Sequence, residues 1–227
     1  AILGDVIRLP LVSLVWWRVL LSIVIIFFLV GPYRMMLSMN RTFLLRHVFI
    51  GLLISVHWLA FYGSIKIANA SIVLIAMSTQ SFFTALIEPL ISFDLLMSLM
   101  VIPAMILIFY SADQVQQLGL WIGLIAAVLG AVFSIYNKIW IIDGKELEIT
   151  LVQQGTVFLG LGILLIFPFF GQGTRFEVPQ GVDWFYMIVF AAVCTVLAYF
   201  LYLRALHWLS AFDVNFAFNM EPVYGLI

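Results

Sequence analysis

The sequence predicts an all-α membrane protein, a polytopic helical bundle made of two inverted-topology repeats. Hydrophobic residues make up 65% of the chain and charged residues only 9%, whereas a soluble domain is roughly half apolar and about a quarter charged. The apolar residues form long runs with short polar connectors, and two of the junctions resemble each other. This small number of charges cannot cover a water-facing surface. We therefore expect the chain to be surrounded by a lipid bilayer.

The overall charge and the cysteine content exclude several function classes. The formal net charge is −1, and no basic stripe is present to neutralise phosphates, so no nucleic acid is expected as a partner. The single cysteine, Cys194, excludes an internal disulfide and a cysteine-based metal cluster. The sequence predicts no metal site and no cofactor.

Eight apolar runs are long enough to be considered as spans. A spanning helix needs about 20 apolar residues, and the candidates are residues 9–30, 48–66, 70–91, 95–110, 118–140, 150–170, 184–206 and 212–227. The connector 92–94 is very short, and the span after it is near the lower length limit. Pro103 and Pro168 mark expected kinks.

The two ends of the sequence predict a larger protein. Residues 1–4 are typical of the end of an earlier apolar helix, and the last run stops at Ile227 after 16 residues without a cap. We therefore expect eight visible spans of a ten-helix protein. Its first repeat would occupy residues 1–113 and its second 114–227, each lacking one terminal helix.

Basic residues predict the orientation of the spans. The connector after the first span carries Arg34, Arg41, Arg46 and His47 and is the most basic in the chain, so it is placed in the cytoplasm. With this assignment the inside helix ends hold more Lys and Arg than the outside ends. The expected location is a bacterial inner (cell) membrane, with multiple passes.

The repeat is visible at an offset of 141 residues. At this offset Phe61 pairs with Tyr202, Lys66 with His207, Ala70 with Ala211, Val73 with Val214 and Gln80 with Glu221. Each copy contains an apolar helix, a polar corner and a second apolar helix. In the predicted topology the two copies run in opposite directions, which is the usual construction of secondary transporters. Chance similarity between two amphipathic corners is the alternative.

A family resemblance follows from an ordered set of features. These are Pro10 followed by Trp16-Trp17-Arg18, the basic loop after the first span, the corners FYGSIKIANAS and YLRALHWLSA, and Glu221-Pro222 in the last span. Together they resemble EamA-type members of the drug/metabolite transporter superfamily over nearly the whole chain. The resemblance implies ten helices in two inverted five-helix repeats that move small organic solutes, often outward. The first half departs from it, with Gln80-Ser81 in place of Glu221-Pro222 and Glu88-Pro89 eight residues later.

Glu221 is the first candidate site residue, because an ionisable group at membrane depth is costly and is seldom kept without a role. It is predicted to line the path, where it would bind a cation or exchange a proton, and a buried structural carboxylate is the alternative. Asn215 and Asn219 share a helix face and can both donate and accept, although hydrogen bonds between helices also explain them. Gln80 is the first-half counterpart of Glu221.

Aromatic pairs complete the expected site. Tyr199 and Tyr202 form one stripe, and Trp58 and Tyr62 a similar one. Such walls suit amphiphilic solutes, and packing between helices explains them almost as well. The remaining substrate-binding candidates are His57, on a different face of its helix, and Asn137. Arg18 is expected to pair with a carboxylate such as Glu88 or Glu221.

The small residues Gly119, Gly123, Ala126, Gly130 and Ser134 share one helix face. They predict close helix packing between the halves.

Transport by alternating access is the predicted function. The solute would be an amino acid or related metabolite, most simply exported, with the protein acting as a monomer or homodimer. The sequence contains no GxxxxGK[ST] loop and no HExxH motif, so ATP-driven pumping within this chain and zinc hydrolysis are not predicted. The chain is therefore not expected to be an enzyme. A membrane-embedded enzyme acting on a lipid or peptide is the main alternative, and an oligomeric scaffold or receptor is a third.

Overall fold

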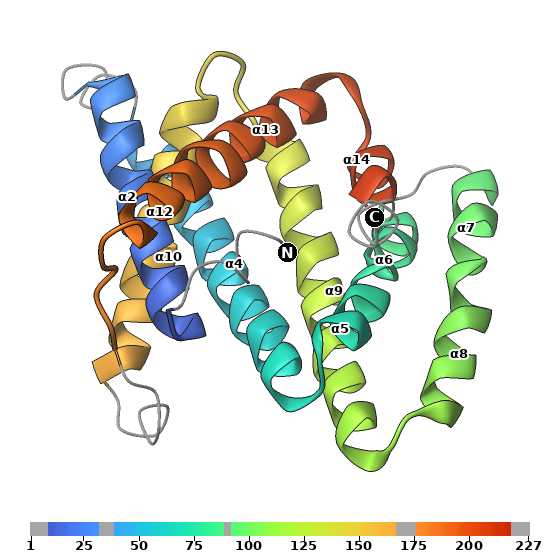
Figure 1. Cartoon of the computed structure of the whole chain (residues 1–227). Coiled ribbons are helices and arrows are strands. Elements are labelled where there is room, and N and C mark those ends of the chain that lie inside the picture. The colour runs from blue at the N-terminus through green and yellow to red at the C-terminus, as the bar shows by residue number, and fades with distance from the viewer. Residues whose placement is uncertain (1–8, 32–38, 89–91, 167–175, 219–227) are drawn as a thin grey trace. The chain divides into compact units, whose positions relative to one another are not determined.

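The computed structural model describes residues 9–31, 39–88, 92–166 and 176–218. Every regular element in these residues is helical (Figure 1), which confirms the predicted all-α class for this part. In chain order the elements are α2 (Leu11–Val30), α4 (Arg41–Ile67), α5 (Ala70–Met77), α6 (Gln80–Ile87), α7 (Ser92–Leu99), α8 (Val101–Ser111), α9 (Gln114–Trp140), α10 (Glu146–Ile166), α12 (Asp183–Ala191), the π-helical turn η1 (Ala192–Leu197), α13 (Ala198–Trp208) and α14 (Ala211–Phe218).

Five helical stretches in the described residues are long and apolar enough to cross a membrane. They cover Ser13–Val30, Arg41–Ile67, Ala70–Ile87, Gln114–Trp140 and Asp183–Trp208. This agrees with a multi-pass membrane protein. The eight spans and the ten-helix total stay predictions, and the last predicted span is described only as far as Phe218.

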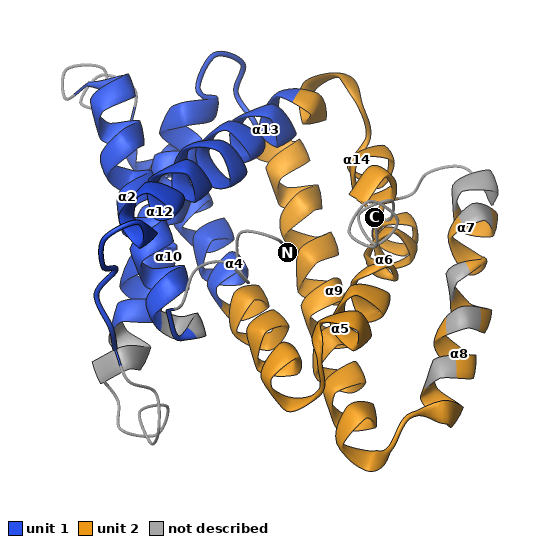
Figure 2. Cartoon of the chain, viewed as in Figure 1, with its two compact units in different colours: residues 1–55, 141–204 blue, residues 56–140, 205–227 orange. Residues whose placement is uncertain are grey.

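The chain divides into two compact units (Figure 2). Unit 1 contains Ala1–Ser55 and Ile141–Arg204, and unit 2 contains Val56–Trp140 and Ala205–Ile227. Each unit therefore combines segments from before and after residue 113. The predicted repeats, 1–113 and 114–227, are defined by their symmetry and not by compactness, so the two compact units do not test them. The repeats stay a prediction.

Two helices begin earlier than the sequence predicted. α4 begins at Arg41 instead of residue 48, because the Asn40 side chain accepts a hydrogen bond from the Phe43 N–H (2.8 Å) and caps the helix. α10 begins at Glu146 instead of residue 150, with Glu146 and Glu148 in its first turn, where the helix dipole favours carboxylates. In both cases a polar first turn had been assigned to the connector.

The connector predicted at 92–94 is wrong, because these residues lie inside α7. The expected span 95–110 is interrupted instead at Met100, between α7 and α8. The cause is Pro103 in the first turn of α8. It has no N–H to bond to the Leu99 carbonyl, and its ring would clash with that carbonyl in a continuous helix. Pro168 lies outside the described residues.

In unit 1, α2 packs against α10 and α12. Trp16 and Trp17 belong to an aromatic cluster with Phe158, Phe176 and Trp184. Trp17 also donates a hydrogen bond from Nε1 to the Glu177 carbonyl (3.1 Å). The guanidinium of Arg18 lies over the Phe190 ring at 5.1 Å from its centroid.

In unit 2, α5, α6 and α14 pack on α9 (Figure 1). The predicted small-residue face makes these contacts. A Cβ added at Gly119 would lie 2.4 Å from the Ala68 Cβ, and one at Gly123 2.7 Å from the Ala76 Cβ. Ser64 Oγ donates to the Gly119 carbonyl at 2.6 Å. The face therefore lets neighbouring backbones approach more closely than larger residues permit.

We expect Gly119→Ala to lower the free energy of unfolding by about 1–3 kcal/mol, because the new methyl group overlaps Ala68 and forces the helices apart. Thermal unfolding of the purified protein in lipid nanodiscs measures the change. Gly63→Ala is the matched control, since nothing lies within 4 Å of the methyl group it adds, and it should be neutral or stabilising by up to about 1 kcal/mol. Equal effects of the two substitutions would contradict the assigned packing.

Candidate functional site

The two sequence-related corners have the same local structure. α4 ends at Ile67 and α5 begins at Ala70, whereas α13 ends at Trp208 and α14 begins at Ala211. The end of α13 lies 141 residues after the end of α4, and the start of α14 lies 141 residues after the start of α5. This is the offset that the sequence predicted. The main-chain hydrogen bonds agree as well, since Ala68 N–H donates to Ser64 O and Leu209 N–H donates to Ala205 O, each at 2.9 Å.

The caps of the second helices also correspond. The Asn69 side chain accepts from Ile72 N–H (3.0 Å), and the Ser210 hydroxyl accepts from Asp213 N–H (3.0 Å). In each case an N-cap side chain satisfies the amide three residues later. The residue types differ, but the capping function is kept at the same offset.

The corners lie near opposite ends of α9. Ala68 lies next to Gly119 and Gln80 next to Gly130, so the segment from α5 to α6 runs in the same direction as α9. Lys138 bonds to the Leu209 carbonyl, and Ser134 bonds to Asn215, so α14 runs against α9. α5 and α14 therefore run in opposite directions within unit 2.

A buried hydrogen-bond network joins three helices of unit 2 around Asn215. Its Oδ1 accepts from Gln80 Nε2 (2.9 Å) and Ser134 Oγ (3.1 Å). Its Nδ2 donates to Thr84 Oγ1 (2.8 Å), which donates in turn to the Gln80 carbonyl (2.8 Å). Asn215, Thr84 and Ser134 are buried, and Gln80 is half-buried. We call these four residues the Asn215 network; it consists of neutral groups and links α6, α9 and α14.

Charged groups hold the corner between α13 and α14. Lys138 Nζ donates to the carbonyls of Leu206 and Leu209 at the end of α13, the second at 2.9 Å. Glu88 Oε2 accepts from the Phe212 N–H in the first turn of α14 (3.1 Å). A cation at a helix C-terminus and an anion at an N-terminus both match the helix dipole. Glu88, whose role the sequence left open, thus stabilises the start of α14.

The predicted span 70–91 is interrupted at Ser78 and Thr79, between α5 and α6. Ser78 Oγ donates to Ile75 O and Thr79 Oγ1 to Ala76 O, both at 2.6 Å. Hydroxyl groups thus satisfy carbonyls near the break, as lipid surroundings require. Discontinuous helices of this kind form the binding sites of many transporters, and this one directly precedes Gln80.

The other unit 2 candidates lie on α4 and α9. His57 is buried, with Nδ1 2.7 Å from the Ala126 carbonyl and its ring against Phe133. Trp58 and Tyr62 are half-buried, and their rings contact each other edge to face. Asn137 is buried one turn after Ser134 on α9. His57 is therefore part of the contact between α4 and α9.

The tyrosine pair belongs to unit 1, where it joins a second polar chain. The Tyr199 and Tyr202 rings pack at 5.3 Å between centroids. Tyr199 OH donates to Gln153 Oε1, and Gln153 Nε2 lies 3.2 Å from His47 Nδ1. Gln153 and His47 are both buried, with exposed fractions of 0% and 1%. We call His47, Gln153 and Tyr199 the His47 chain; it links α4, α10 and α13.

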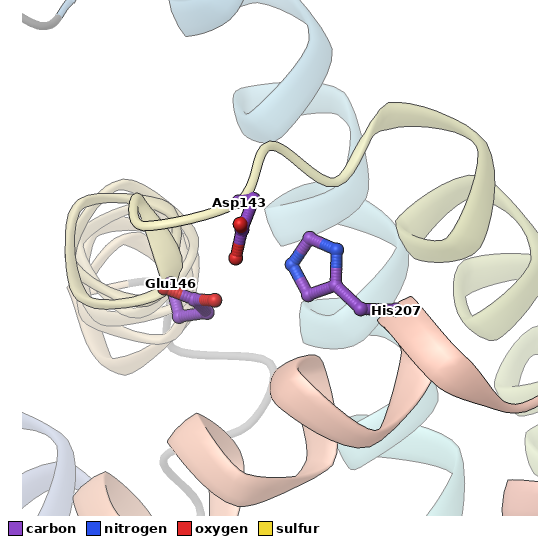
Figure 3. A group of neighbouring side chains, drawn as sticks. All are labelled: Asp143, Glu146 and His207. Carbon is purple, nitrogen blue, oxygen red and sulfur yellow. The ribbon is translucent and has the colours of Figure 1, made fainter.

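Figure 3 draws three further side chains, Asp143, Glu146 and His207. Asp143 and Glu146 belong to unit 1 and His207 to unit 2. Glu146 Oε1 accepts from the Gly144 N–H (3.4 Å), which is a local contact at the start of α10. Two carboxylates alone do not make a structural or catalytic metal site, and none is assigned to them.

Part of this arrangement was predictable from the sequence. Gln80 and Asn215, both predicted as site residues, bond to each other directly, and Tyr199, also predicted, bonds to Gln153. Asn219 and Glu221 lie outside the described residues. Thr84, His47 and Gln153 were missed as site residues. His47 had been assigned to a loop, and Gln153 lies near the start of its predicted span, so neither stood out as a buried polar group.

No protein-family model, no curated protein and no solved structure matches the chain.

We expect Gln80→Leu and Asn215→Leu to be energetically coupled, because each removes one side of the same buried hydrogen bond. The double-mutant cycle should give a coupling of about 0.6–2 kcal/mol, the range for hydrogen bonds between membrane helices. Unfolding in nanodiscs is the measurement. Phe216, exposed on the next position of α14, gives the control pair Gln80→Leu with Phe216→Ala, which should be additive within about 0.5 kcal/mol. Additivity in both cycles would refute the network.

Proposed function

We propose that this chain is the core of a secondary transporter that moves a small organic solute, such as an amino acid or related metabolite, by alternating access. The observation that carries the proposal is the pair of corners described above. They match in boundaries, main-chain bonds and capping at one offset, and their second helices run in opposite directions along α9. Inverted repeats with a site near the bilayer midplane are characteristic of secondary transporters.

Two further features support the proposal. The interruption at Ser78 and Thr79 directly precedes Gln80, and polar side chains from three helices meet at this residue and at Asn215. Polar groups inside membrane helices are costly, and functional paths are a common reason for keeping them. The resemblance to EamA-type members of the drug/metabolite transporter superfamily leads to the same function, with export as the expected direction. A multi-pass location in a bacterial inner membrane belongs to this proposal.

The substrate is sought first by binding. A ligand that binds only the native protein raises its unfolding temperature by mass action. A thermal-shift screen of the full chain against amino acids, nucleosides, sugars and lipophilic cations therefore selects a solute for transport assays. Uptake and efflux of that solute in proteoliposomes then test transport directly.

We expect Glu221→Gln to reduce solute flux by about tenfold or more, which corresponds to about 1.4 kcal/mol in the barrier. The reason is that Glu221 occupies the position related to Gln80 by the repeat and would line the solute path. Glu177→Gln is the matched control, since the Glu177 side chain is exposed and its hydrogen bonds use main-chain atoms, and it should keep normal flux. Unchanged flux in Glu221→Gln would remove this residue from the path. Chemical conversion of a solute in detergent, without a membrane gradient, would instead support the enzyme alternative.

A further inference from the structure

The His47 chain contains a side-chain amide held between two titratable groups. Gln153 directs its Nε2 toward His47 Nδ1 and its Oε1 toward the Tyr199 hydroxyl. An amide nitrogen can only donate hydrogen bonds, and an amide oxygen can only accept them. His47 Nδ1 must therefore be the acceptor, and the proton of the neutral ring lies on Nε2.

Protonation of His47 reverses this requirement. The imidazolium carries hydrogens on both nitrogens, so Nδ1–H would face the N–H groups of Gln153. Rotating the Gln153 amide by half a turn restores the contact, with Oε1 accepting from Nδ1–H. The amide nitrogen then donates to the Tyr199 oxygen, and the Tyr199 hydroxyl hydrogen must turn toward another acceptor. His47 gains one proton and one N–H bond, no other covalent bond is made or broken, and the hydrogen bonds of Gln153 reverse their direction.

We propose that His47 is a proton-binding site whose state is transmitted to Tyr199 through the amide of Gln153, and that it couples proton movement to transport. The coupling part rests on the proposed function. The three residues come from α4, α10 and α13, so the reversal alters contacts among three helices of unit 1. Tyr199 also packs on Tyr202, which extends the effect to the aromatic stripe that the sequence placed in the solute path.

The charged groups around His47 set the conditions for its protonation. On α4, Arg46 is the adjacent residue. At the start of α10, Lys145 lies 5.6 Å from the centre of the Phe43 ring, which itself contacts His47, and Glu146 lies about two turns before Gln153 on the same face. On α13 the facing groups are Tyr199 and Tyr202. On α2, which packs on α10, Arg18 lies over Phe190. The two cations Arg46 and Lys145 therefore oppose a further positive charge on His47, and Glu146 favours it.

His57 provides an internal control on the same helix. Its Nδ1 faces the Ala126 carbonyl, which can only accept, so the neutral ring carries its proton on Nδ1. Protonation of His57 would occur on Nε2 and would leave this hydrogen bond unchanged. The two histidines of α4 are thus predicted to be opposite tautomers. On protonation, the hydrogen-bond partner must rotate at His47 but not at His57.

Solid-state NMR of the full chain, labelled with ¹⁵N-histidine in lipid bilayers, tests the proton site without a substrate. The sequence contains only three histidines, and His47→Gln and His57→Gln assign their signals. At alkaline pH we expect the Nε2–H tautomer for His47 and the Nδ1–H tautomer for His57. Tyr199→Phe, which keeps the ring, and Gln153→Leu should each give a mixture of tautomers at His47 only. An Nδ1–H tautomer at His47, or no change in these variants, would overturn the proposal.

Flux of the screened solute under an imposed pH difference tests the coupling. The acidic side is taken down to about pH 4, because the burial of the His47 ring and the adjacent Arg46 both oppose its protonation. Wild type and Glu177→Gln, a change at an exposed side chain outside the proposed path, should respond to the gradient, and Gln153→Leu should transport without responding. Flux that ignores the gradient in the wild type would overturn the coupling and leave transport standing. Absence of any flux would contradict the proposed function, and the tautomers would still decide whether the proton site exists.

Discussion

The structure depends on one constraint, that a chain surrounded by lipid must satisfy its backbone polar groups internally. An unsatisfied amide or carbonyl in hydrocarbon costs several kcal/mol, and every helix end or interruption exposes such groups. In the described residues, specific side chains serve these places. Asn69 and Ser210 cap two helix starts, and Lys138 binds carbonyls at the end of α13. In η1, Thr195 Oγ1 donates to the Phe190 carbonyl (3.3 Å) within the wider turn. Polar residues that look costly in the sequence are thus placed where the backbone needs them.

The same constraint explains why α9 is central to unit 2. Its small residues remove the side chains that would keep neighbours away, so Ser64 and Ala68 reach its backbone at one end. At the other end a long Lys138 side chain reaches across to the next corner. Close packing therefore stabilises the corner between α4 and α5, and charged side chains at helix ends stabilise the corner between α13 and α14. α14 is secured twice, by Glu88 at its first turn and by Asn215 farther along.

Composition and periodicity predicted the helical class, the apolar stretches and the packing face of α9, because these follow from many residues acting together. The corner offset was also visible, although only as a few identities. Single-residue effects were harder to predict. Asn40 and Glu146 extend their helices because caps and dipoles favour polar first turns. The kink expected at Pro103 is present, and its break lies three residues before the proline, at Met100. The Asn215 network was only partly predictable. Thr84 lies in an apolar helix, and the sequence does not show whether its hydroxyl group bonds to a neighbouring helix or the side chain only packs. His47 and Gln153 come from distant segments, and only the fold brings them together.

Both units place a side-chain amide at the centre of a buried polar chain, and the two amides differ in what surrounds them. An amide donates and accepts without a charge, so it can connect helices at far lower cost than an ion pair in lipid. Asn215 has both ends occupied by three neutral groups from α6 and α9. Reversing its orientation would require the single hydroxyl hydrogen of Thr84, which already bonds to the Gln80 carbonyl, so one hydrogen bond would be lost. Gln153 lies between a histidine and a tyrosine, and both of these can exchange donor for acceptor. The same chemical group is therefore locked in one unit and reversible in the other, because of its neighbours and not because of its own structure.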